Sequence, residues 1–230
     1  MKENFKKLIK EYTDEQEWNH QFTFSDGTKT RKIDIDSPGY NLNKWPRIKN
    51  IIRQLSFNKG DFIDVGCSDG YYSLQLAKLN ERYNVTGIDL DEIRIKKAKL
   101  VKEIFEVKNV NFFFEDLYNL IDQKKKFETV LGLGLLHRVP DINACIKDLC
   151  EISERYVIFE FKSYNSEIDE ALSHNLKTKS NKLNKLYKTP SIIYVKNRMK
   201  ENSFKTLLFD EDTTSSLNYP RTIIVGERIE

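Results

Sequence analysis

Acids and glycines lie close together in residues 61–77, DFIDVGCSDGYYSLQLA, where an apolar run stops at Asp64 and a second run begins with helical spacing. Gly66 and Gly70 bound the turn between the two runs, the glycine turn, and a glycine lets a ligand approach the backbone because it has no Cβ. Asp64 and Asp69 place two carboxylates here, which would repel a pyrophosphate and favour a cation. The stretch therefore predicts a site for a positively charged ligand head.

A dinucleotide site is the main alternative for a glycine turn between a strand and a helix. Its fingerprint, G-x-G-x-x-G, brings a pyrophosphate onto the backbone and the helix N-terminus. Ser68 stands at the middle position of the turn in this chain, so the fingerprint is not met. A plain strand-to-helix turn that binds no ligand is the remaining alternative.

Two further acidic positions follow the next two apolar runs. Asp89 lies near the end of the stretch VTGIDLD, 19 positions after Gly70, near the spacing at which an acid accepts both hydroxyls of a ribose. Two such charge-assisted hydrogen bonds would contribute about 1.5 to 3 kcal/mol each. Glu115 and Asp116 end the stretch FFFED, where one of them could accept from an adenine amino group. Helix capping is the structural alternative for Asp89 and Asp116, but ribose, adenine and a cationic amino-acid head together describe S-adenosylmethionine (SAM).

Alternating strands and helices must hold these acids at one edge of a sheet. The predicted strands are DFIDVG, NVTGIDLD, NVNFFFED, FETVLGLGLL, RYVIFEFK, FKTLLFDED and RTIIVGERIE, and the predicted helices lie at 70–80, 91–105, near 117 and at 141–153. Such alternation predicts a parallel sheet covered on both faces, with its ligand crevice at the carboxyl ends of the strands. The predicted fold class is α/β, Rossmann-like and doubly wound, with a mostly parallel seven-stranded sheet and an antiparallel last strand.

The chain, at 230 residues, is long enough for one domain with a substantial core. Residues 1–44 predict an N-terminal extension, a helix followed by a hairpin that turns at Asp26 and Gly27. A further helix then leads into the main domain, residues 45–230. The strand and helix pattern of this domain is interrupted by a polar insert at about residues 163–200, which we expect to cover the substrate.

Five stretches, taken in order, resemble the motifs of class I SAM-dependent methyltransferases: DFIDVGCSDGYYSLQLA, VTGIDLD, NVNFFFEDL, FETVLGLGLLHRVPD and RTIIVGER. The likeness covers about residues 45–162 and the final strands. It implies that SAM is bound by residues spread over these motifs. They are Asp64, Gly66 and Gly70 around the methionine part, Asp89 at the ribose, Asp116 at the adenine and Leu90 along its ring, with Ser68 and Leu133 completing the set. Ser68 departs from the family, which usually has glycine there.

A weaker likeness concerns one subgroup of this family. The stretches LLHRVP and YYSL resemble enzymes that carboxymethylate the wobble uridine of transfer RNA, although this chain is shorter and the pattern around His137 is offset. Residues 162–205, the basic region, hold ten basic residues against four acids and would follow RNA phosphates in such an enzyme. A solvated helical surface is the alternative for the same charges.

Candidates for the acceptor chemistry follow the fourth and fifth strands. Methyl transfer from a sulfonium is an in-line displacement, which needs a general base only when the acceptor must lose a proton. His137 is the candidate base, with packing beside the cofactor as its alternative, and Arg138 would clamp an acidic acceptor. Glu160 would serve as a catalytic base or as an orienting group, and Lys162 would bind a carboxylate or a phosphate.

Side chains of the N-terminal extension are candidates for a lid over the substrate. Trp18, His20 and Tyr40 would either cover the site or pack the extension onto the core. We assign His20 and Tyr40 to substrate binding.

Composition and spacing narrow the remaining possibilities. Cys67, Cys145 and Cys150 have no metal-ligand spacing, so we expect no metal site and no disulfide. The chain has neither a secretory signal nor an apolar stretch of the roughly 18 residues that span a bilayer, which favours a cytoplasmic protein without membrane contact. The net charge of +3 is too small to imply a polyanionic partner by itself.

Three functions remain open from the sequence. The favoured one is a SAM-dependent methyltransferase acting on a hydroxyl or carboxylate of a small molecule, because the Asp/Asn-Pro-Pro-aromatic turn of amino-directed nucleic-acid enzymes and a nucleophilic cysteine at a strand end are both missing. The second is a transfer RNA-modifying methyl or carboxymethyl transferase, and the third is a non-catalytic binding module with the cofactor fold. A homodimer is compatible with each of them.

Overall fold

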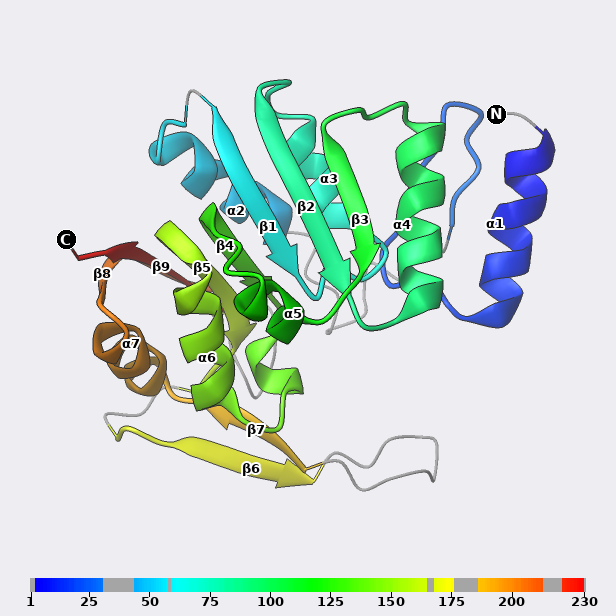
Figure 1. Cartoon of the computed structure of the whole chain (residues 1–230). Coiled ribbons are helices and arrows are strands. Elements are labelled where there is room, and N and C mark those ends of the chain that lie inside the picture. The colour runs from blue at the N-terminus through cyan, green and yellow to red at the C-terminus, as the bar shows by residue number, and fades with distance from the viewer. Residues whose placement is uncertain are drawn as a thin grey trace. The chain divides into compact units, whose positions relative to one another are not determined.

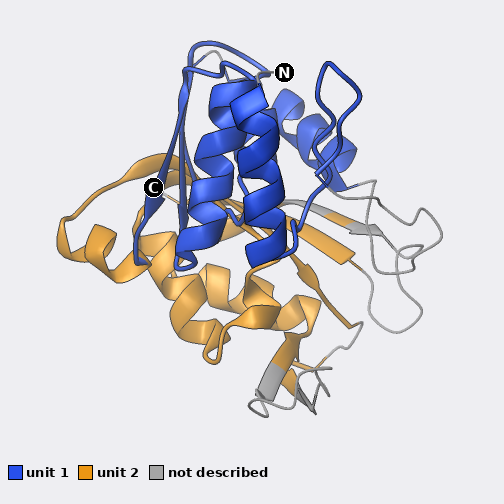
Figure 2. Cartoon of the chain, turned by 90° about the vertical axis from the view of Figure 1, so that its right-hand side faces the viewer, with its two compact units in different colours: residues 1–116 blue, residues 117–230 orange. Residues whose placement is uncertain are grey.

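The computed structural model describes residues 3–30, 44–57, 59–164, 168–175, 186–212 and 221–229. Contacts divide the chain into two compact units, residues 1–116 and residues 117–230, which Figure 2 shows in blue and orange. The division into an N-terminal extension before residue 45 and a main domain after it stays a prediction.

Unit 1 holds three parallel strands in the order β3-β2-β1. The strands are β1 (Gly60–Val65), β2 (Tyr83–Asp89) and β3 (Val110–Phe114), and the helices are α1 (Glu3–Glu15), α2 (Lys44–Gln54), α3 (Tyr71–Ala77) and α4 (Glu92–Ile104). Phe62, Ile63 and Val85 are completely buried, as expected for parallel strands covered on both faces. Helices α3 and α4 pack on β2 and β3, and α1 lies beside α4 (Figures 1 and 2).

The segment after α1 packs tightly onto unit 1. The Trp18 side chain is buried, and its Nε1 donates a 2.9 Å hydrogen bond to Thr13 Oγ1. The Lys97 ammonium from α4 lies 5.0 Å from the Trp18 ring centroid, within cation–π range. Further on, Thr23 and Lys29 form an antiparallel bridge around the predicted hairpin turn. Trp18 thus takes the packing role that the sequence left open.

Unit 2 holds four strands in the order β4-β5-β9-β8. The strands are β4 (Phe127–Leu133), β5 (Ser153–Lys162), β8 (Phe204–Asp212) and β9 (Arg221–Arg228), and the helices are α5 (Leu117–Asp122), the short 3₁₀ helix η1 (Leu136–Arg138), α6 (Ile142–Glu151) and α7 (Ile192–Glu201). Strand β4 is parallel to β5, whereas β9 is antiparallel to both β5 and β8. The predicted α/β fold class, with seven mostly parallel strands and an antiparallel last strand, is confirmed.

The predicted polar insert contains regular structure. Strands β6 (Ala171–Asn175) and β7 (Leu186–Pro190) pair antiparallel as a separate two-stranded sheet (Figure 1), and α7 follows them. Ser191 caps the N-terminus of α7 with its side chain. Val195 and Met199, one turn apart, are fully buried and attach the helix to its unit.

No helix in the described part of the chain is long and apolar enough to cross a bilayer. The described ranges also contain no group of three His, Cys, Asp or Glu side chains placed to hold a metal ion. Cys67, Cys145 and Cys150 are free and buried, and burial raises the pKa of Cys145 and Cys150 to about 12. These two thiols are therefore protonated core groups and poor nucleophiles.

Candidate functional site

The glycine turn after β1 is fixed by the end of β2. Gly66 N and Cys67 N both donate to Ile88 O at 2.9 Å. Gly66 and Gly70 have φ angles of +74° and +78°, in the left-handed region that favours glycine. A Cβ on Gly70 would lie 2.7 Å from the Phe112 ring, so packing also requires glycine there. The turn therefore brings bare backbone to the start of α3.

Asp64 is the acid of β1, one residue before its end, and its side chain is buried. Its Oδ2 accepts a 2.6 Å hydrogen bond from Ser73 Oγ of α3. Burial raises the pKa of Asp64 to about 6, although the Ser73 hydrogen bond and the Lys44 charge oppose the rise. A cationic ligand would hold this carboxylate in its ionised form. The position fits the cationic methionine head that the sequence predicts for it.

Asp89 ends β2 and organises the backbone on both sides of it. Its Oδ2 accepts from Ser68 N at 2.8 Å, and its Oδ1 accepts from Asp91 N at 2.9 Å. The helix cap of α4 is Asp91, whose side chain accepts from Ile93 N and Arg94 N, so capping is not the role of Asp89. Each carboxylate oxygen can accept more than one hydrogen bond. Asp89 therefore retains the capacity to accept from ribose hydroxyls.

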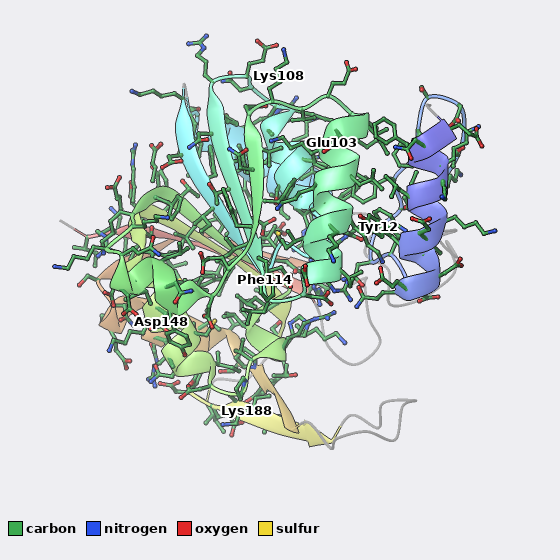
Figure 3. The ribbon with its side chains drawn as sticks, turned by 45° about the vertical axis from the view of Figure 1, so that its right-hand side comes forward. Tyr12, Glu103, Lys108, Phe114, Asp148 and Lys188 are labelled. Carbon is green, nitrogen blue, oxygen red and sulfur yellow. The ribbon has the colours of Figure 1, made fainter. Side chains whose placement is uncertain are left out.

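Exposed apolar side chains flank Asp89. Leu90 is 66 % exposed and Phe114 is 58 % exposed. Phe114 is the register partner of Asp89 where β3 pairs with β2, and Figure 3 shows it at the end of β3. Asp116 follows, and its backbone N–H donates to Glu115 Oε1 at 3.1 Å. Apolar faces beside two acids at the strand ends suit a nucleobase with an amino group.

Asp69 has a different role from the one that the sequence predicts. Its buried side chain accepts hydrogen bonds from Asn19 N at 2.8 Å and His20 N at 2.9 Å, and its other oxygen contacts His20 Nδ1. Burial alone would raise the pKa of Asp69, but the charge and hydrogen bonds of His20 lower it. The prediction of a second ligand-facing carboxylate in the turn is corrected, because backbone amides of the N-terminal segment occupy this carboxylate.

His20 and Ser68 belong to the same N-terminal contact. The His20 ring stacks on Tyr71 with centroids 5.0 Å apart. Ser68 has a backbone φ of +55°, a value that residues other than glycine rarely adopt. Its hydroxyl accepts from Asn19 Nδ2 at 2.6 Å and from Arg94 Nη1 at 3.0 Å. These two donors account for a serine at a position where the family usually has glycine.

Unit 2 brings Glu160, His137, Lys162 and Arg221 together, and we call these four residues the acceptor cluster. Glu160 of β5 is fully buried and binds Arg221 of β9 through two contacts, 2.5 Å from Nε to Oε1 and 2.7 Å from Nη2 to Oε2. His137 in η1 accepts from Lys162 N at its Nδ1 (3.3 Å), and its Nε2 lies 3.5 Å from Arg221 Nη1. Arg138, next to His137, is exposed.

The His137 ring is electrically neutral. Burial lowers the pKa of His137 to about 2, and Arg221 lowers it further while Glu160 opposes the effect. A neutral imidazole carries one N–H, so only one of its nitrogens can accept a hydrogen bond. Lys162 N at Nδ1 and Arg221 Nη1 at Nε2 are both donors, so a protein donor already faces the ring lone pair in either tautomer. The role of His137 as a base stays a prediction.

The remaining assigned residues are placed as follows. Leu133 ends β4 and is buried, and the next residue, Gly134, donates from its N–H to Glu160 O at 2.7 Å. Tyr40 lies outside the described residues. The sequence reasoning missed Asn19 and Arg221, whose partners are distant in the chain. The sequence offered one signal for Arg221. It is the first residue of the last strand, and a strand that closes the sheet must pair beside β5, where Glu160 lies.

Comparisons with known proteins identify the family of this chain. A family model described as a methyltransferase domain matches residues 56–213. A tRNA U34 carboxymethyltransferase from Nautilia profundicola is 31 % identical over 129 residues, which are 53 % of this chain and 39 % of that protein. A ubiquinone biosynthesis O-methyltransferase from Coxiella burnetii is 33 % identical over 102 residues, 44 % of this chain and 42 % of that protein. The matches therefore span about two fifths of the length of these relatives.

Solved structures share the fold at low sequence identity. The N-terminal domain of EvdMO1 with SAH bound superposes with a TM-score of 0.74 at 16 % identity, covering 100 % of this chain and 98 % of that one. Magnesium protoporphyrin IX methyltransferase from Synechocystis with bound SAM gives a TM-score of 0.66 at 18 % identity, covering 86 % of each chain. These similarities show the fold alone.

Proposed function

The chain belongs to the family of methyltransferase domains, whose class I members use SAM, and we propose from this premise that it transfers a methyl group to a hydroxyl or carboxylate oxygen of a small molecule. The matched residues, 56–213, include the glycine turn, Asp89 and most of the acceptor cluster. The predictions of the class I family and of SAM as its cofactor are confirmed.

The acidic residues of unit 1 are the main support for SAM binding in this proposal. Asp64 is a buried carboxylate beside bare glycine backbone, and Asp89 fixes the same turn while keeping acceptor capacity. Bound SAM supplies an activated methyl group on a positively charged sulfonium. We assign Asp64 to its charged head, Asp89 to the ribose hydroxyls, and Leu90 and Phe114 to the faces of the adenine. Asp116 would accept from the adenine amino group.

The acceptor cluster favours a carboxylate acceptor over a hydroxyl. A carboxylate is already ionised at neutral pH and needs no general base, whereas a hydroxyl must lose a proton. His137 is neutral with its Nδ1 facing Lys162 N, and both oxygens of Glu160 are held by Arg221. We therefore propose that Glu160 and His137 orient the cluster, and that no side chain of this cluster removes a proton from the acceptor.

Substitution of His137 tests this assignment. A general base typically contributes roughly 10²- to 10⁴-fold to a rate. We expect His137→Ala to reduce methyl transfer from labelled SAM to a panel of small hydroxycarboxylic acids, which offer both kinds of oxygen, by less than about tenfold between about pH 6 and pH 9. The product should be an alkali-labile methyl ester. A loss of about a hundredfold or more, or an alkali-stable ether as product, would restore His137 as a base.

A transfer RNA substrate is the second candidate, supported by the relative from Nautilia profundicola and by the basic region. Its single arginine is paired, because Arg198 Nη2 lies 3.0 Å from Asp169 Oδ2 and 2.8 Å from Glu201 Oε1. Neutralised charge contributes little to binding phosphates. We expect no saturable binding of total transfer RNA in a filter assay even at low salt. Binding that weakens steeply with added salt would favour the RNA substrate instead.

Three other assignments also stay proposals: a cytoplasmic location, a homodimer and the covering role of His20. A non-catalytic module is distinguished from an enzyme by the same labelled assay. Such a module would bind SAM and transfer no label to any acceptor class.

A further inference from the structure

Two backbone amides orient the Asp89 carboxylate in unit 1. Ser68 N donates to Asp89 Oδ2 at 2.8 Å, and Asp91 N donates to Asp89 Oδ1 at 2.9 Å. A carboxylate held at both oxygens presents its remaining lone pairs in fixed directions. The direction in which Asp89 can accept from a ribose therefore depends on where Ser68 and Asp91 are placed.

Asn19 holds the first of these two residues. The positive φ of Ser68 is unfavourable for a residue with a Cβ, so the backbone of Ser68 needs support from its surroundings. Asn19 Nδ2 supplies it with a 2.6 Å hydrogen bond to Ser68 Oγ. Asn19 is itself fixed through its backbone, because its N–H donates to the buried Asp69 carboxylate at 2.8 Å. Asn19 therefore links a buried anchor to the residue whose N–H reaches Asp89.

Gln16 holds Asp91 in the corresponding way. Its Nε2 donates to Asp91 Oδ2 at 2.9 Å, and the hydrogen bonds that Asp91 accepts lower its pKa and keep it ionised. An ionised carboxylate only accepts, so the amide nitrogen of Gln16 must face it. Gln16 Oε1 is then buried without a hydrogen-bond partner among the described residues, which costs folding free energy. The contact with Asp91 therefore has a cost that folding alone does not explain.

The segment that carries both amides, residues 16–20, is fixed to α4 by separate contacts. The buried Lys97 of α4 donates from its Nζ to Gln16 O and lies 5.0 Å from the ring centroid of the buried Trp18. The preceding helix, α1, lies beside α4 (Figure 1). The two amides are thus presented from a backbone that is held in place without the glycine turn.

Arg94 of α4 contacts the same two residues. Its Nη1 donates to Ser68 Oγ at 3.0 Å, and its Nε lies 3.2 Å from Asp91 Oδ2. Ser68 and Asp91 are therefore each held by the arginine and by one amide of residues 16–20. This arrangement ties the N-terminal segment to both donors that orient Asp89.

We propose that Gln16 and Asn19 are positioning residues of the cofactor site, which hold Asp91 and Ser68 and thereby keep the Asp89 carboxylate oriented for the ribose before SAM binds. The inference rests on the proposed function and deepens it, because it makes SAM affinity depend on the N-terminal segment. A site that is ordered in advance has a smaller ordering cost on binding. Loss of either amide should therefore weaken SAM binding without removing a group that touches SAM.

A double-mutant cycle in the full chain tests the path through Ser68. Calorimetric titration measures the SAM affinity of the wild type, Asn19→Ala, Ser68→Gly and the double variant. We expect Asn19→Ala to weaken SAM binding at least about fivefold in the wild type, because Ser68 loses the support of its unfavourable backbone. In the Ser68→Gly background the same substitution should change the affinity less than about twofold, since glycine adopts a positive φ unaided and lacks the hydroxyl that Asn19 binds.

Gln16→Ala tests the path through Asp91 independently. We expect this variant to bind SAM at least about fivefold more weakly than the wild type, because Asp91 loses a hydrogen bond to its charged side chain. Glu17→Ala removes an exposed side chain of the same segment, and as the matched control it should bind SAM as the wild type does. Chemical denaturation of each variant establishes that it is folded during the titration.

Three results would count against these assignments in different ways. Equal losses from Asn19→Ala in both backgrounds would show a structural role that does not pass through Ser68, and would overturn the assignment of Asn19. SAM affinity of Gln16→Ala within about twofold of the wild type would overturn that of Gln16, and this arm decides the inference should Asn19→Ala not fold. Wild-type binding that both substitutions leave unchanged removes only the positioning role, whereas absence of SAM binding to the wild type counts against the proposed function.

Discussion

Asp89→Ala is expected to weaken SAM binding by about a hundredfold or more. Two charge-assisted hydrogen bonds to a ribose are worth about 1.5 to 3 kcal/mol each, and each 1.4 kcal/mol is about tenfold in affinity. The variant also removes the acceptor of Ser68 N and Asp91 N, which fixes the glycine turn. Calorimetric titration of the variant with SAM measures the loss directly.

Two matched variants give this prediction its control. Asp89→Asn removes the charge and keeps the shape, so its affinity should fall between those of the wild type and Asp89→Ala. Glu92→Gln removes a neighbouring exposed carboxylate of α4 that pairs with Lys96 at 3.2 Å, and it should bind SAM as the wild type does. Wild-type affinity in Asp89→Ala would show that the ribose assignment is wrong.

Asp69→Ala is expected to lower the free energy of unfolding by about 3 to 5 kcal/mol. The substitution leaves Asn19 N, His20 N and the His20 ring without their buried acceptor. Lost hydrogen bonds to a buried charge are costly because the partners cannot regain water. Chemical denaturation followed by circular dichroism measures the change, and Asp14→Ala, an exposed acid of α1, should differ from the wild type by less than about 0.5 kcal/mol.

The same contribution should depend on pH in a defined direction. The pKa of Asp69 is lowered from its ordinary value of 3.8, so its stabilising effect is present above pH 3.8 and is lost as the pH falls through the folded-state pKa. The stability difference between wild type and Asp69→Asn should therefore shrink in acid. A difference that stays constant into acid, or a cost of Asp69→Ala below about 1 kcal/mol, would contradict the anchoring role of Asp69.

The elements with strong apolar periodicity could be predicted from the sequence. The helix predicted at 91–105 is α4 at Glu92–Ile104, and the helix predicted at 141–153 is α6 at Ile142–Glu151. Both helices bury one apolar stripe against parallel strands, and the apolar residues that form such a stripe recur at short intervals along the chain. The glycine turn was equally readable, because Gly66 and Gly70 adopt the left-handed backbone that their residue type favours.

The remaining features depend on contacts between distant residues. His20 and Asp69 are 49 positions apart, and Glu160 and Arg221 are 61 positions apart, so no local spacing indicates either pair. In α7 the polar residues Lys196, Asn197 and Arg198 separate the buried Val195 from the buried Met199 and conceal a narrow apolar stripe, so the sequence predicts only a polar insert there. The role predicted for Asp69 is therefore corrected, whereas the cofactor roles of Asp64, Asp89 and Asp116 stay predictions.

SAM binding by the turn that joins Asp64 to Gly70 underlies the proposed activity. The most direct measurement is calorimetric titration of the wild-type chain with SAM and, separately, with NAD, at about pH 7.5 and about pH 5. We predict micromolar binding of SAM, no binding of NAD, and weaker SAM binding at the lower pH, because Asp64 with its pKa of about 6 becomes protonated and neutral there. Absence of SAM binding at both pH values, or binding of NAD in preference to SAM, would contradict the account.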